Sequence, residues 1–219
     1  MQRLVYGVRA VDVIVSVKRA HGIASITFSS GDTLRVPSAV YKEFCVREGE
    51  PIDHEAYALL IEKYAYPHAM ERAANLLAAR DYSENELRRR LLRAAYSENT
   101  VDRVLETLRN HRFVSDERFS AQYVARKVPT RGKRRIYQEL RQKGVSEDVA
   151  KEALESISED DEDEGALARA EKFFRRRDGN DPDERRRCIA ALVRQGYSFT
   201  TARNAVRRVT ETEDDIEEE

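Results

Sequence analysis

The sequence predicts a mainly α-helical fold, an elongated array of three tandem three-helix repeats that follows a small N-terminal α+β extension of a strand hairpin and short helices. Convincing strand signals are confined to residues 11–36, whereas a helix–turn–helix pattern recurs three times in the rest of the 219-residue chain. Charged residues make up 36% of the chain and hydrophobic residues 41%. This balance suits thin amphipathic helices better than a β-sandwich or an enzyme barrel.

Residues 1–66 form the predicted N-terminal α+β cap. The segment VDVIVSV alternates, so that one face of a strand carries Val11, Val13, Val15 and Val17. Residues 24–36 then indicate a strand, a turn and a second strand. The turn is expected near Gly31, because glycine permits a positive φ.

Two short helices complete the predicted cap. Pro37 precedes the first, over AVYKEFCVREG, with Ser38 as its N-cap and Gly49 as its stop. The second covers residues 53–64 and ends before Pro67, because proline lacks the amide N–H that a helix interior needs.

Three later segments align with one another, starting at Leu87, Ile136 and Cys188. Apolar positions recur in all three at helical spacings of four and three. The column Ala95/Gly144/Gly196 falls where one helix must end in a left-handed residue, and the column Ser97/Ser146/Ser198 is expected to cap the next helix. Each segment therefore predicts a helix, a tight turn and a helix.

A further helix precedes each pair, over residues 69–80, 117–127 and 164–177. Ser83 with Glu86, and Asp181 with Pro182, predict the starts of the middle helices of repeats one and three. Because units of this size barely bury a core of their own, neighbouring repeats should share contacts in an elongated array. The predicted boundaries are 67–114 for repeat one, 115–158 for repeat two, 159–210 for repeat three and 211–219 for an acidic tail.

The acidic residues are concentrated in two runs, Glu159–Glu164 and Glu211–Glu219. The formal net charge of −1 becomes +12 when the thirteen acids of these runs are set aside. We interpret the runs as a linker and a tail on a basic body, which indicates contact with a polyanion or an acidic groove and attached competitors for that contact. The alternative is that the acidic runs serve only solubility and disorder.

Several classes of protein are disfavoured by the sequence. The two cysteines are far apart and form no CxxC, and the four histidines show no metal-ligand spacing, so we expect no disulfide framework, no metal site and no cofactor. No clustered nucleophile or ligand set indicates an enzyme. The chain shows neither a signal peptide nor an apolar run of eighteen residues, which predicts a cytoplasmic protein that does not cross a membrane. We expect a monomer.

Basic residues are concentrated on the middle helix of each repeat and predict a basic stripe at one place in every unit. Arginine suits phosphate or carboxylate bidentately, so the stripe is the candidate surface for DNA or an acidic protein. The alternative is a solvated face with pairs such as Glu84–Arg88 and Glu86–Arg90. The candidate residues are Arg88, Arg89, Arg90, Arg93, Arg131, Lys133, Arg134, Arg135, Arg141, Lys143, Arg185, Arg186, Arg187 and Arg194, together with Tyr137.

Aromatic residues interleave with these basic residues, and bases of single-stranded nucleic acid stack on aromatic rings. For most of them packing is the better interpretation, as for Phe113, Phe119 and Tyr123 at core-spaced positions. Tyr137, beside arginines and off the apolar columns, is the exception to be tested for stacking.

Three runs resemble the RecX family of recombinase regulators: DYSENELRRRL at 81–91, FVSDERFSAQYVARK at 113–127 and GKRRIYQELRQKGV at 132–145. The resemblance covers residues 68–209, and the N-terminal segment is similar to an extension of some members. It implies three tandem three-helix repeats, binding in the groove of the RecA–DNA filament, and suppression of filament growth, ATP hydrolysis and strand exchange in recombination and the SOS response. It implies no catalysis by this chain.

The acidic run at 158–164, the loop at 178–183 and the acidic tail are not parts of the family pattern. A stand-alone DNA-binding helical repeat protein is the alternative function, because helix–turn–helix pairs with basic helices also enter DNA grooves.

Overall fold

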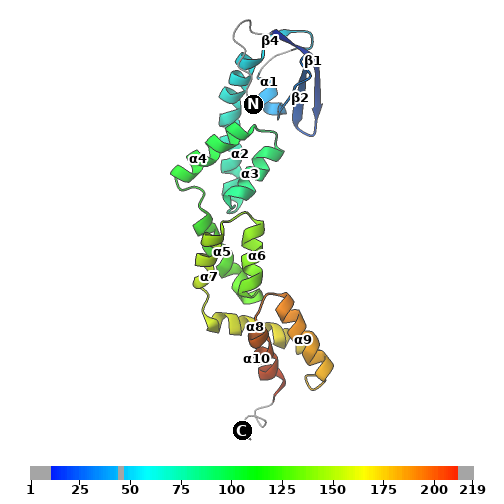
Figure 1. The fold of residues 1–219 in the computed structure, drawn as a ribbon, viewed down its shortest axis with the longest axis vertical. Helices are drawn as coiled ribbons and strands as arrows, with labels where there is room; N and C mark the ends of the chain where they lie inside the picture. The colour runs from blue at the N-terminus through cyan, green and yellow to red at the C-terminus, as the bar shows by residue number, and fades with distance from the viewer. Residues whose placement is uncertain (1–10, 44–46, 212–219) are drawn as a thin grey trace. The chain divides into compact units, whose positions relative to one another are not determined.

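The structure is a computed structural model that describes residues 11–43 and 47–211 (Figure 1). It divides into two compact units, residues 1–114 and 115–219. The first holds the sheet and the first repeat, and the second holds repeats two and three. The prediction of a mainly α-helical fold with an N-terminal hairpin is confirmed.

The sheet of the first unit is antiparallel, with strand order β3-β2-β1-β4. The two strands and the turn predicted over residues 24–36 are confirmed, and Gly31 has a φ of +91°. The sequence missed the fourth strand, because three residues beginning with proline carry no alternating pattern. The strands are β1 (Val11–Ala20), β2 (Ile23–Phe28), β3 (Thr33–Pro37) and β4 (Pro51–Asp53).

The prediction of one valine face on β1 was wrong at Val15. The register between β1 and β2 shifts between Ile14 and Ser16, which is the mark of a β-bulge. Ile14 is therefore fully buried while Val15 is 58% exposed, and Val17 returns to the edge of the core. One extra residue exchanges the two faces of a strand.

The predicted first helix is shorter than expected. Helix α1 (Ser38–Lys42) has Pro37 at its N-cap position without a side-chain cap, so Ser38 is its first residue and not its cap. The Ser38 amide instead donates to the carbonyl of Gly22 over 2.8 Å. Because α1 ends at Lys42, Gly49 is not its stop either, although its φ is +84°. Residues 44–46 of the predicted helix lie outside the described residues.

Helix α2 (His54–Ala79) is continuous through Pro67, so the predicted break before that residue was wrong. The reason is a buried row at every fourth residue that spans the proline, which favours one continuous helix packed on a core. Proline removes one main-chain hydrogen bond, and this packing outweighs the loss. The buried row consists of Tyr57, Ile61, Ala65, Ala69 and Ala73.

Helix α2 leads from the sheet to the first repeat pair, α3 (Glu84–Arg93) and α4 (Glu98–Asn110) (Figure 1). The sheet, α2 and this pair share one hydrophobic core that includes Ile14, Tyr57 and Leu87. The cap and the first repeat are therefore packed as one body.

The second unit contains two further sets of three α-helices. Repeat two has α5 (Asp116–Lys127), α6 (Lys133–Gln142) and α7 (Glu147–Glu155), with a 3₁₀ turn, η1 (Val128–Thr130), after α5. Repeat three has α8 (Glu159–Phe174), α9 (Pro182–Arg194) and α10 (Phe199–Thr210). Each set has a core of its own. None of the described helices is both long enough and apolar enough to cross a lipid bilayer.

The predicted joints between paired helices are confirmed in all three repeats. Ala95, Gly144 and Gly196 have φ values of +67°, +86° and +96°. The hydroxyls of the three column serines each accept a hydrogen bond from the amide three residues later, and these serines are Ser97, Ser146 and Ser198. The predicted starts at Ser83, with its Glu86 capping box, and at Asp181 are confirmed as well.

The prediction that the acidic run Glu159–Glu164 is a linker was wrong, because these residues form the first turns of α8. Ser158 and Asp161 form a capping box there, and acidic residues near a helix N-terminus interact favourably with the helix dipole. Helix α8 therefore begins five residues before the predicted start at residue 164 and ends at Phe174. The carboxylate of Glu162 also accepts a 3.1 Å hydrogen bond from the amide of Lys133, which ties the run to repeat two.

Repeats two and three meet through backbone at very short range. A Cβ added to Gly132 would lie 2.3 Å from backbone atoms of Gly196, and one added to Gly196 would lie 2.4 Å from Arg135. Only glycines allow the start of α6 to approach the end of α9 this closely.

Candidate polyanion-binding surface

The predicted pairs between neighbouring charges on α3 do not form. The Glu84 carboxylate binds Arg109 on α4, at 2.5 Å, and the Glu86 carboxylate lies 3.6 Å from Arg80. These partners come from outside α3, so α3 uses its acids to hold its neighbours in place.

The four candidate arginines of α3 have different environments. Arg88 is paired with Asp102 on α4, and the Nε of Arg89 donates to the carbonyl of Asn85 over 3.4 Å. The Arg90 guanidinium is exposed and lies 5.1 Å from the centroid of the Tyr82 ring. Arg93 is exposed and makes no hydrogen bond or ion pair within the described part of the chain. Neither Arg90 nor Arg93 has a carboxylate partner among the described residues.

Glu139 organises the basic residues at the start of α6. Its carboxylate accepts hydrogen bonds from Arg135, at 2.9 Å, and from the Tyr123 hydroxyl, at 2.8 Å, and lies 3.9 Å from Arg131. Burial alone would raise the pKa of Glu139, but these hydrogen bonds and arginine charges together hold it below its usual value. Arg131 and Arg135 therefore form part of a structural network.

The other basic candidates of repeat two include residues with contacts inside the repeat and one exposed residue without a partner among the described residues. Arg141 donates to the carbonyl of Val145 over 2.5 Å, and the Lys143 ammonium lies 5.3 Å from the centroid of the Tyr123 ring. Lys133 is half-buried, whereas Arg134 is exposed and has no hydrogen bond or ion pair within residues 11–43 and 47–211. Arg134 is the freest cation of this helix.

In repeat three, Arg185 is a structural residue. Its guanidinium donates to the carbonyls of Gly179, over 2.5 Å, and Thr210, over 3.3 Å, and so ties the loop before α9 to the end of α10. Arg186 and Arg187 are exposed and pair within α9 with acids three residues earlier, at 3.2 and 2.6 Å. Arg194 is exposed and, in the described residues, has neither hydrogen bond nor ion pair.

The predicted recurrence of the basic triplet at one place in each unit holds only for repeats two and three. Lys133–Arg135 and Arg185–Arg187 directly precede the first core residue of their helices, Ile136 and Cys188. In α3 the triplet Arg88–Arg90 instead follows the first core residue. The triplet of the first repeat is therefore displaced by four residues, about one helical turn, and keeps nearly the same face of its helix one turn farther along α3.

Repeats one and three share an exposed arginine at an equivalent position of their middle helices. Arg93 and Arg194 both lie two residues after the second buried residue of their middle helix, Leu91 and Leu192, and both are exposed. Arg93, Arg134 and Arg194 together form the unpaired set.

Further exposed cations were not predicted from the sequence. Arg72 lies on α2, and Lys172, Arg175 and Arg176 line a cavity of about 360 Å³ at the end of α8. The run Arg175–Arg177 was a visible signal for the second group. Arg72 is a single arginine that only the packing of α2 identifies.

The aromatic predictions were partly confirmed. Phe119 and Tyr123 are buried in the core of repeat two, but Phe113 is 61% exposed, so its assignment to a core was wrong. Tyr137 packs half-buried against the same core, so it does not lie off the apolar face as the sequence indicated. Among the described residues no group of three or more His, Cys, Asp or Glu side chains could hold a metal ion.

Comparison with known proteins identifies the repeats. Family models for the first, second and third three-helix domains of RecX match residues 69–108, 115–154 and 160–206. Regulatory protein RecX of Chromobacterium violaceum is 36% identical over 138 residues, which are 62% of this chain and 86% of that protein. Regulatory protein RecX of Clostridium perfringens (strain 13 / Type A) is 25% identical over 177 residues, 80% of this chain and 83% of that protein.

Solved structures show the same fold. A crystal structure of regulatory protein RecX has a TM-score of 0.60 at 24% sequence identity and covers 87% of this chain and 96% of that one. RecX from Lactobacillus salivarius has a TM-score of 0.59 at 18% identity, with 66% of this chain and 96% of that one covered. With three consecutive repeat domains matched and a relative above 30% identity, this chain belongs to the RecX family of regulatory proteins.

Proposed function

We propose that this chain regulates the RecA recombinase by binding in the groove of the RecA–DNA filament and restraining filament growth, ATP hydrolysis and strand exchange. Its membership of the RecX family supports this role. The chain acts as a cytoplasmic monomer, carries no cofactor and catalyses no reaction itself.

The observation that carries the proposal is the unpaired set. Arg93, Arg134 and Arg194 are exposed on the middle helices of the three repeats, and none has a hydrogen bond or ion pair among the described residues. A guanidinium whose charge is not neutralised internally remains able to take a carboxylate or a phosphate from a partner. One such group in each repeat gives three points of attachment to a partner with a repeating acidic surface.

Attachment at several points would inhibit the filament by restricting its subunits. A filament is a repeat of one subunit, and a regulator held by two or more subunits restricts their relative motion. Growth at the filament end and the subunit movements of nucleotide turnover both require that motion. Linked weak contacts also raise the overall affinity far above that of each single contact.

The test is assembly of single recombinase filaments on DNA, together with ATP turnover, in the presence of the wild-type chain and of the triple variant Arg93→Glu, Arg134→Glu, Arg194→Glu. We expect the wild-type chain to slow both processes and the variant to lose most of the effect. Arg88 and Arg135 are left unchanged because their ion pairs with Asp102 and Glu139 stabilise the fold.

A matched control is available in the N-terminal cap. Lys18, Arg35 and Lys42 are exposed and have no ion pair in the described part of the chain. The variant Lys18→Glu, Arg35→Glu, Lys42→Glu makes the same change of net charge away from the middle helices, and it should inhibit like the wild type. Unchanged filament extension and ATP turnover with the wild-type chain would falsify the proposal.

Stand-alone DNA binding is the second candidate. Helix α6 carries Lys133, Arg134 and Arg135 in its first turn, and basic helices of helix–turn–helix pairs contact DNA phosphates through such side chains. Tight binding of duplex DNA by the chain without recombinase would favour this candidate. The logarithm of the association constant should then fall with the logarithm of the salt concentration, with a slope of about −0.9 for each neutralised phosphate.

A further inference from the structure

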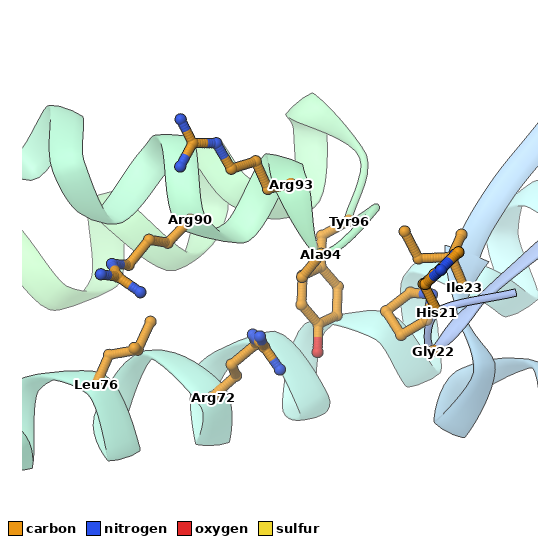
Figure 2. Close-up of a pocket in the computed structure, with 10 residues that line it drawn as sticks. His21, Gly22, Ile23, Arg72, Leu76, Arg90, Arg93, Ala94 and Tyr96 are labelled. Atoms are coloured by element: carbon orange, nitrogen blue, oxygen red, sulfur yellow. The ribbon is translucent and has the colours of Figure 1, made fainter.

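A cavity of about 300 Å³ lies in the first unit between α2, α3 and the turn that joins β1 to β2 (Figure 2). Arg72 comes from α2, Arg90 and Arg93 come from α3, and His21 comes from the turn. Tyr96 closes one side of the cavity. Three elements far apart in sequence therefore bring basic side chains around one hollow.

The charges around this cavity are not balanced by acids. No carboxylate belongs to its lining, and within residues 11–43 and 47–211 neither Arg72 nor Arg90 forms an ion pair. Like charges that share a partly enclosed space repel one another, because the surroundings screen them less than bulk water does. An anion between them removes this repulsion.

Acids do occur in an adjoining cavity of about 470 Å³, which also contacts Arg72. Glu71 and His68 line it, and the imidazole of His68 lies 2.8 Å from the carboxylate of Glu43. The His68–Glu43 pair is satisfied locally, and Glu71 does not line the cavity that holds Arg90. Arg72 thus lines both hollows, whereas Glu71 lines only the adjoining one.

The side chains converge from opposite sides. Arg72 rises from α2 and Arg90 descends from α3 into the space between the two helices, while the guanidinium of Arg93 turns outward at the rim (Figure 2). The hydroxyl of Tyr96 points toward α2, on the side of Arg72. The guanidinium of Arg90 lies 5.1 Å from the centroid of the Tyr82 ring. The guanidinium of Arg80 lies over the same ring, 3.7 Å from its centroid.

We propose that this cavity is a phosphate-binding pocket that takes one phosphodiester of a DNA strand between Arg72 and Arg90. The two non-bridging oxygens of a phosphodiester share one negative charge, and each can accept a charge-assisted hydrogen bond from a guanidinium, so one group can be bound by arginines on facing helices. Arg93, turned outward, lies where the next phosphate of a strand leaves the pocket. The assignment rests on the proposed function, because it gives the regulator a contact of its own with the DNA of the filament.

The test measures binding of a labelled single-stranded oligonucleotide by fluorescence anisotropy at several salt concentrations, without recombinase. The variant Arg72→Gln, Arg90→Gln should bind more weakly, with a log–log salt slope shallower by about 0.7, the loss of one phosphate contact on a single strand. The variant Arg72→Lys, Arg90→Lys keeps the charge and should keep the slope. Lys18→Gln, Arg35→Gln removes two exposed charges elsewhere in the same unit and should leave the slope unchanged.

Circular dichroism shows whether each variant is folded. If the double glutamine variant is not, the single variants Arg72→Gln and Arg90→Gln decide the case, because each should weaken binding and make the slope shallower. The pocket assignment is overturned if the wild-type chain does not bind the oligonucleotide, or if the slope of the folded glutamine variant stays that of the wild type. It is overturned as well if inorganic phosphate or ATP stabilises the wild type through Arg72 and Arg90 while the DNA slope does not depend on them. If the glutamine variant has a shallower slope but the wild-type chain has no effect on filaments, the pocket assignment is supported and the proposed function is rejected.

Discussion

The backbone amide of Gly132 donates a 3.1 Å hydrogen bond to the carbonyl oxygen of Gln195 and thereby joins the start of α6 to the end of α9. The contact links repeat two to repeat three without any side chain of Gly132. It fixes the relation between these two repeats through main-chain atoms, which have little freedom to adjust.

Gly132→Ala should therefore destabilise the second unit. The new Cβ would lie 2.3 Å from backbone atoms of Gly196, and overpacking of this kind costs about 1–3 kcal/mol. Gly196→Ala should cost more, because its φ of +96° adds strain of about 1–2 kcal/mol. Urea unfolding followed by circular dichroism measures both changes in the free energy of unfolding.

The control for that experiment is Gly22→Ala. Gly22 has a φ of +78° and nothing within 4 Å of a new Cβ, so the substitution tests backbone strain alone. A loss for Gly132→Ala no larger than that for Gly22→Ala would show that the close approach of the two repeats is not rigid.

Ala95→Gly should stabilise the first unit by about 1 kcal/mol. Ala95 ends the first helix of its pair at the position where Gly144 and Gly196 stand in the other repeats. A residue with a Cβ is strained at its φ of +67°. Ala94→Gly, one residue earlier at a φ of −81°, is the matched control and should destabilise or have no effect. Equal effects of the two substitutions in thermal unfolding would contradict the argument.

Glu139→Gln should destabilise the protein at neutral pH by about 1–3 kcal/mol, since it removes a charged acceptor from Tyr123 and Arg135. The pKa of Glu139 is lower in the folded protein than its usual value near 4.5. The ionised group therefore stabilises the fold above the unfolded-state pKa, and this contribution is lost as the pH falls through the folded-state pKa.

Unfolding curves at pH 7 and at pH values below about 4.3 check this expectation. The difference in the free energy of unfolding between wild type and Glu139→Gln should become smaller as the pH falls. A difference of the same size at both ends of the pH range would show that the carboxylate charge contributes nothing to stability. Glu147→Gln, an exposed acid of α7, provides the comparison, because its pairing with Lys151 lies at the surface.

Ser146→Ala should cost about 1 kcal/mol, the usual effect of losing an N-cap. The Ser146 hydroxyl accepts from the amide of Val149 over 3.3 Å, so hydrogen exchange at that amide should accelerate. Ser97→Ala should cost more, because Ser97 also binds Glu62 on α2, which the Thr100 hydroxyl contacts at 2.6 Å. Equal losses for the two serines would mean that the bond to Glu62 adds nothing.

The local features of the repeats could be predicted because each depends on residues close in sequence. A serine cap, a left-handed glycine and an apolar row are properties of one turn or one helix. The same rules failed where packing decides: Pro67 lies inside α2 because a buried row continues past it, and a bulge exposes Val15. The acidic run became a helix because its acids lie at an N-terminus, which composition alone does not reveal.

The candidate surface was harder to predict for a related reason. The identity of the basic residues is visible in the sequence, but their partners are not. Glu84 binds Arg109, twenty-five positions away, and leaves Arg88 to Asp102 on the next helix. Only the folded chain separates arginines that stabilise it from those that remain free for a partner, and only the packing of α2 on α3 brings Arg72 toward Arg90.

The shared core of the sheet, α2 and the first helical pair limits how this chain can exchange parts with its relatives. Ile14, Tyr57 and Leu87 lie in one continuous apolar interior, so a graft that cuts at Pro67 divides a single helix and opens that interior to water. A chimeric regulator should therefore take all residues up to Val114 from one protein and switch to the other protein at Ser115, where the second unit begins.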